Sequence, residues 1–244
     1  MRFSANLGFL WTDRPLPEAI RAAAHAGFDA VECHWPYETP PADMRAALAD
    51  TGLPMLSLNT RPGDSFGLAA LPGPAGRAAI DEGLDYAAAI GAGAVHVMAG
   101  TGGSLGIFAD NLHHACTRAA PLGLTVLIEP LNPRDAPGYT LGTLDQAAAL
   151  IEALNHPALK ILFDCYHIAR IDGPAAVAPR FDALRAQIGH VQFAAVPDRG
   201  APDHGDLDYA ALLPSLDWTG PFGAEYRPAG PTDDSLAWLK TLRP

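Results

Sequence analysis

The sequence predicts an α/β protein built as a single (β/α)₈ barrel, in which eight parallel strands close into a cylinder surrounded by helices. Eight short apolar segments alternate with eight Ala- and Leu-rich segments in 244 residues, a number and a length typical of this fold. No linker, charge block or low-complexity tract interrupts the alternation, so we expect residues 1–244 to form one domain. Glycines between a helical segment and the next strand, where a helix C-cap belongs, are Gly27, Gly52, Gly91, Gly123, Gly189 and Gly220.

The predicted strands are short apolar runs that alternate only in part, which is the pattern of strands covered on both faces. In chain order they are residues 3–9, 28–33, 54–58, 94–98, 124–129, 159–164, 190–193 and 221–225. The first follows Met1 and Arg2, and this beginning predicts a strand rather than a secretory leader. A doubly wound parallel sheet is the alternative architecture, but residues 6–11 lack the Gly-rich fingerprint that usually follows its first strand.

Between the predicted strands, apolar residues recur at helical spacing. The predicted helices are residues 17–26, 41–51, 76–90, 107–121, 143–154, 174–187, 207–216 and 233–242. Pro17, Pro41 and Pro174 lie near the starts of three of them, where proline is tolerated. The longest irregular segment, residues 59–75, is rich in Gly and Pro and follows the third strand. It is either a lid at the rim of the barrel or an ordinary surface loop.

The charge of the chain excludes several classes of partner. It has 27 acidic and 16 basic side chains, a net charge of −11, whereas nucleic acids and anionic membranes attract basic surfaces. Cys33, Cys116 and Cys165 are an odd number without paired spacing, which indicates a reducing compartment. No apolar stretch is long enough to cross a bilayer. We therefore expect a cytoplasmic protein that acts on a small molecule, with no nucleic-acid or membrane partner, either as a monomer or as a homo-oligomer.

Four consecutive predicted strands carry polar residues at their ends. Glu129, Asp164 and Glu225 end the fifth, sixth and eighth strands, and Gln192 lies near the end of the seventh. In a β/α barrel these carboxyl ends converge on the active site. Three carboxylates in a partly dry site need protons or a cation, and oxygen ligands favour Mg²⁺ or Mn²⁺ over Zn²⁺. The alternative, that each acid caps a helix or pairs with an arginine, is the weaker explanation for four residues in register.

Five segments of the chain resemble the hydroxypyruvate isomerase family, which belongs to the xylose-isomerase-like barrels. They are RFSANL at 2–7, IEPLN at 128–132, FDCYH at 163–167, GHVQ at 189–192 and GAEYRP at 223–228. The resemblance extends over essentially the whole chain, in order. It implies that Glu129 and Glu225 are the acid–base pair. It also implies a divalent metal ion held by Glu129, Asp164, Gln192 and Glu225.

The resemblance also implies a set of substrate-binding residues, His167 and Arg199. Arg227, close to the end of the eighth strand, is a second candidate to bind a substrate carboxylate. Related epimerases more often have His at the position of Gln192, so this Gln favours the hydroxypyruvate isomerase branch. Ala201 departs from the family's usual Glu, and this difference concerns the rim of the site and hence the exact substrate.

The reaction implied by the resemblance converts hydroxypyruvate to tartronate semialdehyde and back, through an enediolate formed beside the metal. Isomerisation of 2-oxo-tetronate and epimerisation of a ketose at C3 are alternatives within the same chemistry. A serine hydrolase is an alternative of another class, because residues 102–106 match G-x-S-x-G around Ser104, and Asp164 and His190 follow in the chain order of such enzymes. Against it, Ser104 lies several residues beyond the predicted strand end, whereas an elbow serine lies at the strand tip.

Overall fold

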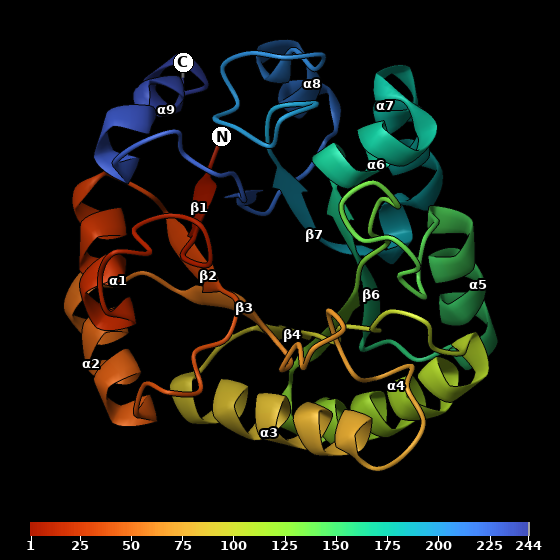
Figure 1. The fold of residues 1–244 in the computed structure, drawn as a ribbon. Coiled ribbons are helices and arrows are strands. Elements are labelled where there is room, and N and C mark those ends of the chain that lie inside the picture. The colour runs from red at the N-terminus through yellow and green to blue at the C-terminus, as the bar shows by residue number, and fades with distance from the viewer. Residues whose placement is uncertain (244) are drawn as a thin grey trace.

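The computed structural model describes residues 1–243 and contains a closed barrel of parallel strands in the order β1 to β8 (Figure 1). The strands are β1 (Phe3–Asn6), β2 (Ala30–Cys33), β3 (Met55–Asn59), β4 (Ala94–His96), β5 (Thr125–Ile128), β6 (Leu159–Asp164), β7 (Ile188–Phe193) and β8 (Phe222–Ala224). Each strand pairs with the next, and pairing of β8 with β1, where Phe222 lies opposite Phe3, closes the cylinder. The predicted (β/α)₈ fold is confirmed.

The helices surround the strands, and each strand is followed by at least one helix (Figure 1). They are α1 (Leu16–His25), α2 (Pro41–Thr51), α3 (Ala75–Ile90), α4 (Leu105–Ala119), α5 (Leu144–Leu154), α6 (Cys165–Asp172), α7 (Val177–Leu184), α8 (Tyr209–Ser215) and α9 (Ala237–Thr241). Short 3₁₀ turns are η1 (Ala120–Leu122), η2 (Pro174–Ala176), η3 (Arg185–Gln187) and η4 (Thr232–Ser235). None of the helices within residues 1–243 has the length and apolar character needed to span a membrane.

The main apolar core lies between the barrel and its helices. Phe3 on β1 and Phe193 on β7 both pack edge-on against Trp238 of α9, with ring centroids 5.4 and 5.5 Å apart. All three side chains are buried. Burial of each large apolar side chain stabilises the fold by roughly 1.5–3 kcal/mol relative to an exposed one. This packing holds the strands in place and leaves the barrel interior free for polar residues.

Inside the barrel, the apolar residues form only a small layer. Ala94, Leu127 and Leu162 make a buried cluster separate from the main core. Leu127 and Leu162 lie two positions before Glu129 and Asp164, and alternate residues of a strand share a face. The small cluster is therefore an apolar floor, above which polar side chains gather at the carboxyl ends of the strands.

The structure departs from the predicted elements after β6. Helix α6 begins directly at Cys165, because Asp164 is its N-cap and accepts a hydrogen bond from the Tyr166 backbone N–H at 2.9 Å. The helical segment predicted over residues 174–187 is present with those bounds, but it consists of η2, α7 and η3 rather than one α-helix. Gly173, with φ +94°, separates it from α6, which the sequence pattern did not predict. Because Asp164 both ends β6 and caps α6, no loop separates the two elements, and the sequence pattern does not show where the helix begins.

Candidate active site

A cavity of about 240 Å³ opens at the carboxyl ends of the strands. Its walls include His34, Glu129, His167, Arg199 and Glu225, which come from five different βα units. A larger surface hollow of about 520 Å³ lies near α8 and α9, but the acids that line it, Asp203 and Asp208, are exposed to solvent. The smaller cavity is the candidate active site because the buried acids meet beside it, as expected for the carboxyl face of a barrel.

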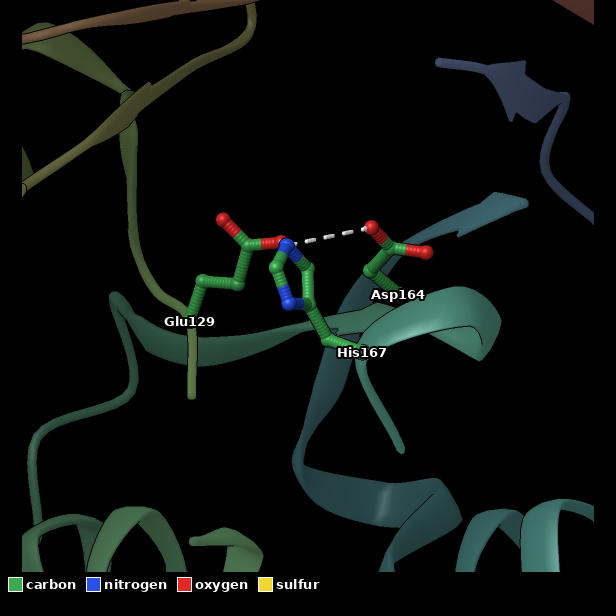
Figure 2. A group of neighbouring side chains, drawn as sticks. All are labelled: Glu129, Asp164 and His167. Carbon is green, nitrogen blue, oxygen red and sulfur yellow. Dashed lines mark ion pairs between the residues drawn. The ribbon is translucent and has the colours of Figure 1, made fainter. Parts of the chain in front are cut away.

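The carboxylates of Glu129 and Asp164 face the imidazole of His167 (Figure 2). His167 Nε2 lies 4.0 Å from Glu129 Oε1 and 3.7 Å from Asp164 Oδ2. His167 Nδ1 accepts the backbone N–H of Asn132 at 3.1 Å, so the neutral ring carries its proton on Nε2. Burial, with Arg199 nearby, lowers the pKa of His167 to about 3, which keeps the ring neutral. His167 is therefore a hydrogen-bond donor toward the cavity.

Three buried oxygens at this site accept no hydrogen bond: Glu129 Oε1, Asp164 Oδ2 and Gln192 Oε1. The amide of Gln192 is oriented by its nitrogen, which donates to Glu32 Oε1 at 2.7 Å. Buried acceptors without partners are unusual, and binding of an ion, a ligand or water is one explanation for them. Two carboxylate oxygens and an amide oxygen form a donor set that suits Mg²⁺ or Mn²⁺. His167 is close enough to act as a ligand, but its Nε2 would first have to lose its proton.

The buried carboxylates strongly perturb one another. Burial, together with the nearby charges of Glu225 and Asp164, raises the pKa of Glu129 well above its usual value. Burial and Glu225 also raise the pKa of Asp164, to about 7, although Arg199 opposes them. Burial alone would raise the pKa of Glu225, but Arg199 and His34 hold it well below its ordinary value. The site therefore requires protons or cations to balance its charge.

Arg199 supplies one such positive charge. One guanidinium nitrogen, Nη2, lies 2.6 Å from Glu225 Oε2 and 3.5 Å from Asp164 Oδ2. The guanidinium lies between two rings, 5.1 Å from the centroid of Phe9 and 5.0 Å from that of Tyr166. Arg199 has φ +59°, a left-handed conformation that is uncommon for a residue with a side chain and is often found at functional sites. Arg199 is thus held by two buried acids and contacts two aromatic rings.

Arg227, the second predicted substrate-binding arginine, also lies at the cavity. Its guanidinium carbon is 5.1 Å from the centroid of the Phe9 ring, which Arg199 also contacts. Its backbone N–H donates to the Arg199 carbonyl at 2.8 Å, which links the loops after β7 and β8. The structure thus brings Glu129, His167, Arg199, Glu225 and Arg227 to the wall of the cavity. Asp164 lies behind His167 and Arg199, within 3.7 Å of both, and Gln192 is buried on the neighbouring strand, opposite Asp164 in the register.

Several polar residues at the site are not among the site residues that the sequence predicts. His34 Nε2 lies 2.8 Å from Glu225 Oε1, and Asn6 Nδ2 donates to the same oxygen at 3.0 Å. Glu32 is buried and bonds to both His190 and Gln192. Burial alone would raise the pKa of Glu32, but the charge of His190 and the hydrogen bonds from His190 and Gln192 hold it below its usual value. The sequence signal for Glu32 is the presence of two acids, Asp29 and Glu32, within the predicted strand at residues 28–33.

Ser104 does not have the surroundings of a hydrolase nucleophile. It is the exposed N-cap of α4, and its Oγ accepts the Gly106 backbone N–H at 3.2 Å. His190 lies inside the barrel, 2.5 Å from Glu32 Oε2, and Asp164 caps α6. The G-x-S-x-G motif is therefore accounted for by helix capping.

The irregular segment between β3 and α3 packs against the loop after β4. Gly67 and Ala99 form an antiparallel bridge, and the backbone N–H of Ala70 donates to the Ala99 carbonyl at 2.7 Å. A side chain at Gly67 would meet the Met98 backbone at 2.4 Å, so this approach requires glycine. Phe66 is half exposed and lines the cavity. The segment thus contributes a wall to the site.

Comparisons with known proteins agree with this architecture. The family described as xylose isomerase-like TIM barrel matches residues 20–242. A 2-oxo-tetronate isomerase of Cupriavidus necator is 40% identical over 98% of this chain and 97% of its own length. A putative hydroxypyruvate isomerase of Homo sapiens is 38% identical over 99% of this chain and 95% of its own. A solved structure from Brucella melitensis, described as an AP endonuclease of family 2, has a TM-score of 0.92 at 35% identity and covers 100% of this chain and 99% of its own. The chain is an isomerase that belongs to the xylose isomerase-like TIM barrel family, which confirms the resemblance seen in its sequence.

Proposed function

We propose that this isomerase interconverts hydroxypyruvate and tartronate semialdehyde through an enediolate, with Glu129 and Glu225 as the acid–base pair. In this proposal Glu129, Asp164, Gln192 and Glu225 hold a Mg²⁺ or Mn²⁺ ion. The observation that carries it is the set of buried, unpartnered oxygens, Glu129 Oε1, Asp164 Oδ2 and Gln192 Oε1, beside a cavity lined by Glu129 and Glu225.

A divalent cation fits these residues for a simple energetic reason. A buried polar atom without a partner costs about 1–3 kcal/mol, and more when it is charged. A cation coordinated by the three oxygens removes that penalty and offsets the repulsion among Glu129, Asp164 and Glu225. When bound, the ion supplies Lewis-acid stabilisation of the charge that develops on the carbonyl and hydroxyl oxygens of the substrate.

The residues of the chain would divide the remaining work. Glu129 and Glu225 extend from the ends of β5 and β8, which are not neighbours in the barrel, so they reach the substrate from different sides. One carboxylate would remove the carbon-bound proton, and the other carboxyl group would return a proton to the adjacent carbon. The proton of the substrate's hydroxyl group would pass to the former carbonyl oxygen. His167 would donate its Nε2–H to a substrate oxygen. Arg199 would bind the substrate carboxylate, either in place of or together with its present contact to Glu225.

A second candidate substrate, 2-oxo-tetronate, follows from the same chemistry. Hydroxypyruvate and 2-oxo-tetronate share a carboxylate, a 2-oxo group and a 3-hydroxyl group, and they differ by one CH₂OH substituent. The relative from Cupriavidus necator carries the name 2-oxo-tetronate isomerase, and the cavity volume of about 240 Å³ accommodates either acid. A free ketose has no carboxylate. The presence of both Arg199 and Arg227 at the cavity therefore favours an oxo acid over a ketose.

The test is substrate profiling of the purified protein. The protein is stripped with EDTA, restored with Mn²⁺ and incubated separately with hydroxypyruvate, 2-oxo-tetronate and a free ketose, and the products are followed by NMR. We expect turnover of hydroxypyruvate that requires the ion and is lost in Glu129→Gln. Turnover of 2-oxo-tetronate but not of hydroxypyruvate would show that 2-oxo-tetronate, and not hydroxypyruvate, is the substrate. Equal rates in the stripped and restored protein would contradict the role of the metal.

A further inference from the structure

Beneath the site lies a buried group of polar residues centred on Glu32, which we call the Glu32 cluster: Ser4, Asn6, Glu32, His190 and Gln192. Glu32 Oε1 accepts hydrogen bonds from Asn6 Nδ2 at 3.0 Å and from Gln192 Nε2 at 2.7 Å. Glu32 Oε2 accepts one from Ser4 Oγ at 3.0 Å and lies 2.5 Å from His190 Nε2. One carboxylate from β2 thus holds side chains of β1 and β7, and no step proposed above uses it.

Glu32 reaches Gln192 only because β8 has a glycine between them. Strands β2 and β7 are not adjacent, since β1 and β8 lie between them in the barrel. Gly223 of β8 pairs with Gln192 of β7 and with Ser4 of β1. A Cβ atom at Gly223 would lie 2.7 Å from Glu32 Oε1 and 2.8 Å from Gln192 Cγ, which is too close for real contacts. Because Gly223 has no side chain, the Glu32 carboxylate has room to accept a hydrogen bond from the Gln192 amide.

The bond determines which way the Gln192 amide points. The Glu32 oxygen facing Gln192 acts as an acceptor, so the NH₂ group of Gln192 must face it and the amide oxygen must face away. A flipped amide would bring two oxygens together at 2.7 Å, in a buried place where no water separates them. The amide oxygen, Gln192 Oε1, is buried and accepts no hydrogen bond, in common with Glu129 Oε1 and Asp164 Oδ2.

We propose that Glu32 is a positioning residue, which locks the Gln192 amide with its oxygen turned toward the metal ion. The inference rests on the proposed function, in which Gln192 is a metal ligand. Asn6 Nδ2 also donates to both Glu32 Oε1 and Glu225 Oε1 at 3.0 Å, but its orientation does not depend on Glu32. The Asn6 amide is itself oriented, since its oxygen accepts the Gly8 backbone N–H at 2.9 Å.

The test measures Mn²⁺ affinity directly, by the electron paramagnetic resonance signal of free Mn²⁺, in wild type, Glu32→Gln, Gln192→Ala and the double variant. The amide introduced by Glu32→Gln has the same shape but presents either an oxygen or an N–H group, so the orientation of Gln192 is no longer imposed. Residues that orient metal ligands typically contribute roughly 10- to 100-fold to affinity, and we expect a loss of that size in Glu32→Gln. Without the Gln192 side chain, Glu32→Gln should weaken binding no further, so the double variant should match Gln192→Ala.

Ser4→Ala is the matched control, because it removes one hydrogen bond to Glu32 and leaves the bond to Gln192 in place. We expect it to bind Mn²⁺ with wild-type affinity. If Glu32→Gln does not fold, Glu32→Asp applies the same test, because the shorter side chain keeps the charge but draws the carboxylate away from Gln192. A loss of affinity in Glu32→Asp then supports the inference, and wild-type affinity overturns it.

The outcomes separate the inference from the proposed function. Wild-type affinity in Glu32→Gln, with weakened binding in Gln192→Ala, would overturn the positioning role and leave the ligand set intact. Losses that add in the double variant would show that Glu32 acts on the fold as a whole, which also overturns the inference. Wild-type affinity in Gln192→Ala would instead contradict the proposed ligand set itself.

Discussion

Replacing Arg199 with methionine tests whether this residue is the internal cation of the site. The substitution keeps an unbranched side chain but removes the charge that lies 2.6 Å from Glu225 and 3.5 Å from Asp164. The three side chains are only 14%, 8% and 0% exposed, so solvent screens the interaction weakly. Removing one partner of such a buried pair typically costs about 3–5 kcal/mol in the free energy of unfolding.

The protonation of the carboxylates sets the size of the expected change. The carboxylates respond to the loss of Arg199 by binding protons, so we expect a value near the lower limit, about 3 kcal/mol. For a domain of this size, that corresponds to a fall in Tm of roughly 6–12 °C. The fall should be larger at pH 8 than at pH 5. The pKa of Asp164 is raised to about 7, so its carboxyl group is mostly charged at the higher pH and mostly neutral at the lower.

The assay is thermal unfolding in EDTA, followed by circular dichroism. Arg227→Met is the matched control, because Arg227 is exposed and forms no ion pair among the described residues 1–243. We expect it to change the free energy of unfolding by no more than about 0.5 kcal/mol. Equal Tm values for Arg199→Met and Arg227→Met would refute the assignment of Arg199 as the cation that balances Glu225 and Asp164.

Three further predictions concern the metal, the substrate and the rejected nucleophile. The affinity for Mn²⁺ should rise as pH increases toward 8, because Glu129 and Asp164 have raised pKa values and must release protons to bind the ion. Calorimetry that shows the same affinity at every pH would contradict this. Phe9→Leu should raise KM for hydroxypyruvate several-fold with little change in kcat, because the ring that contacts Arg199 is lost while the acids stay in place. Initial-rate measurements test this, and a fall in kcat without a change in KM would contradict it. Ser104→Ala should lower the free energy of unfolding by about 1 kcal/mol, because the α4 cap is lost, and should leave isomerase turnover at the wild-type rate. A drop in turnover would give Ser104 a role that its hydrogen bond to Gly106 does not explain.

The order of strands and helices could be predicted from the sequence, because each element is a local pattern. All of the predicted strand segments overlap observed strands, and the glycines at Gly52, Gly91 and Gly123 do follow helical turns with positive φ, as C-caps. The start of α6 was missed because Asp164 serves as strand end and helix cap at once. Local patterns do not reveal such a double role.

The site was predictable where chemistry lies at strand ends, and less so where it depends on contacts across the barrel. Glu129 and Glu225 directly follow apolar strands and Asp164 ends one, so their convergence could be inferred from topology. Glu32 and Gln192 are separated by 160 positions and meet only because the barrel closes and β8 has a glycine there. No spacing rule connects such residues.

The most direct test of the central proposal is the exchange of substrate hydrogen with solvent. Hydroxypyruvate is incubated in D₂O with Mn²⁺ and either wild type, Glu129→Gln or Glu225→Gln, and deuterium at the carbon next to the carbonyl is measured by NMR. Mn²⁺ binding is measured on the same samples, so that loss of the ion is distinguished from loss of proton transfer. The proposal predicts rapid deuterium incorporation by wild type and none above background in either variant that still binds Mn²⁺. Wild-type incorporation in both variants would contradict it.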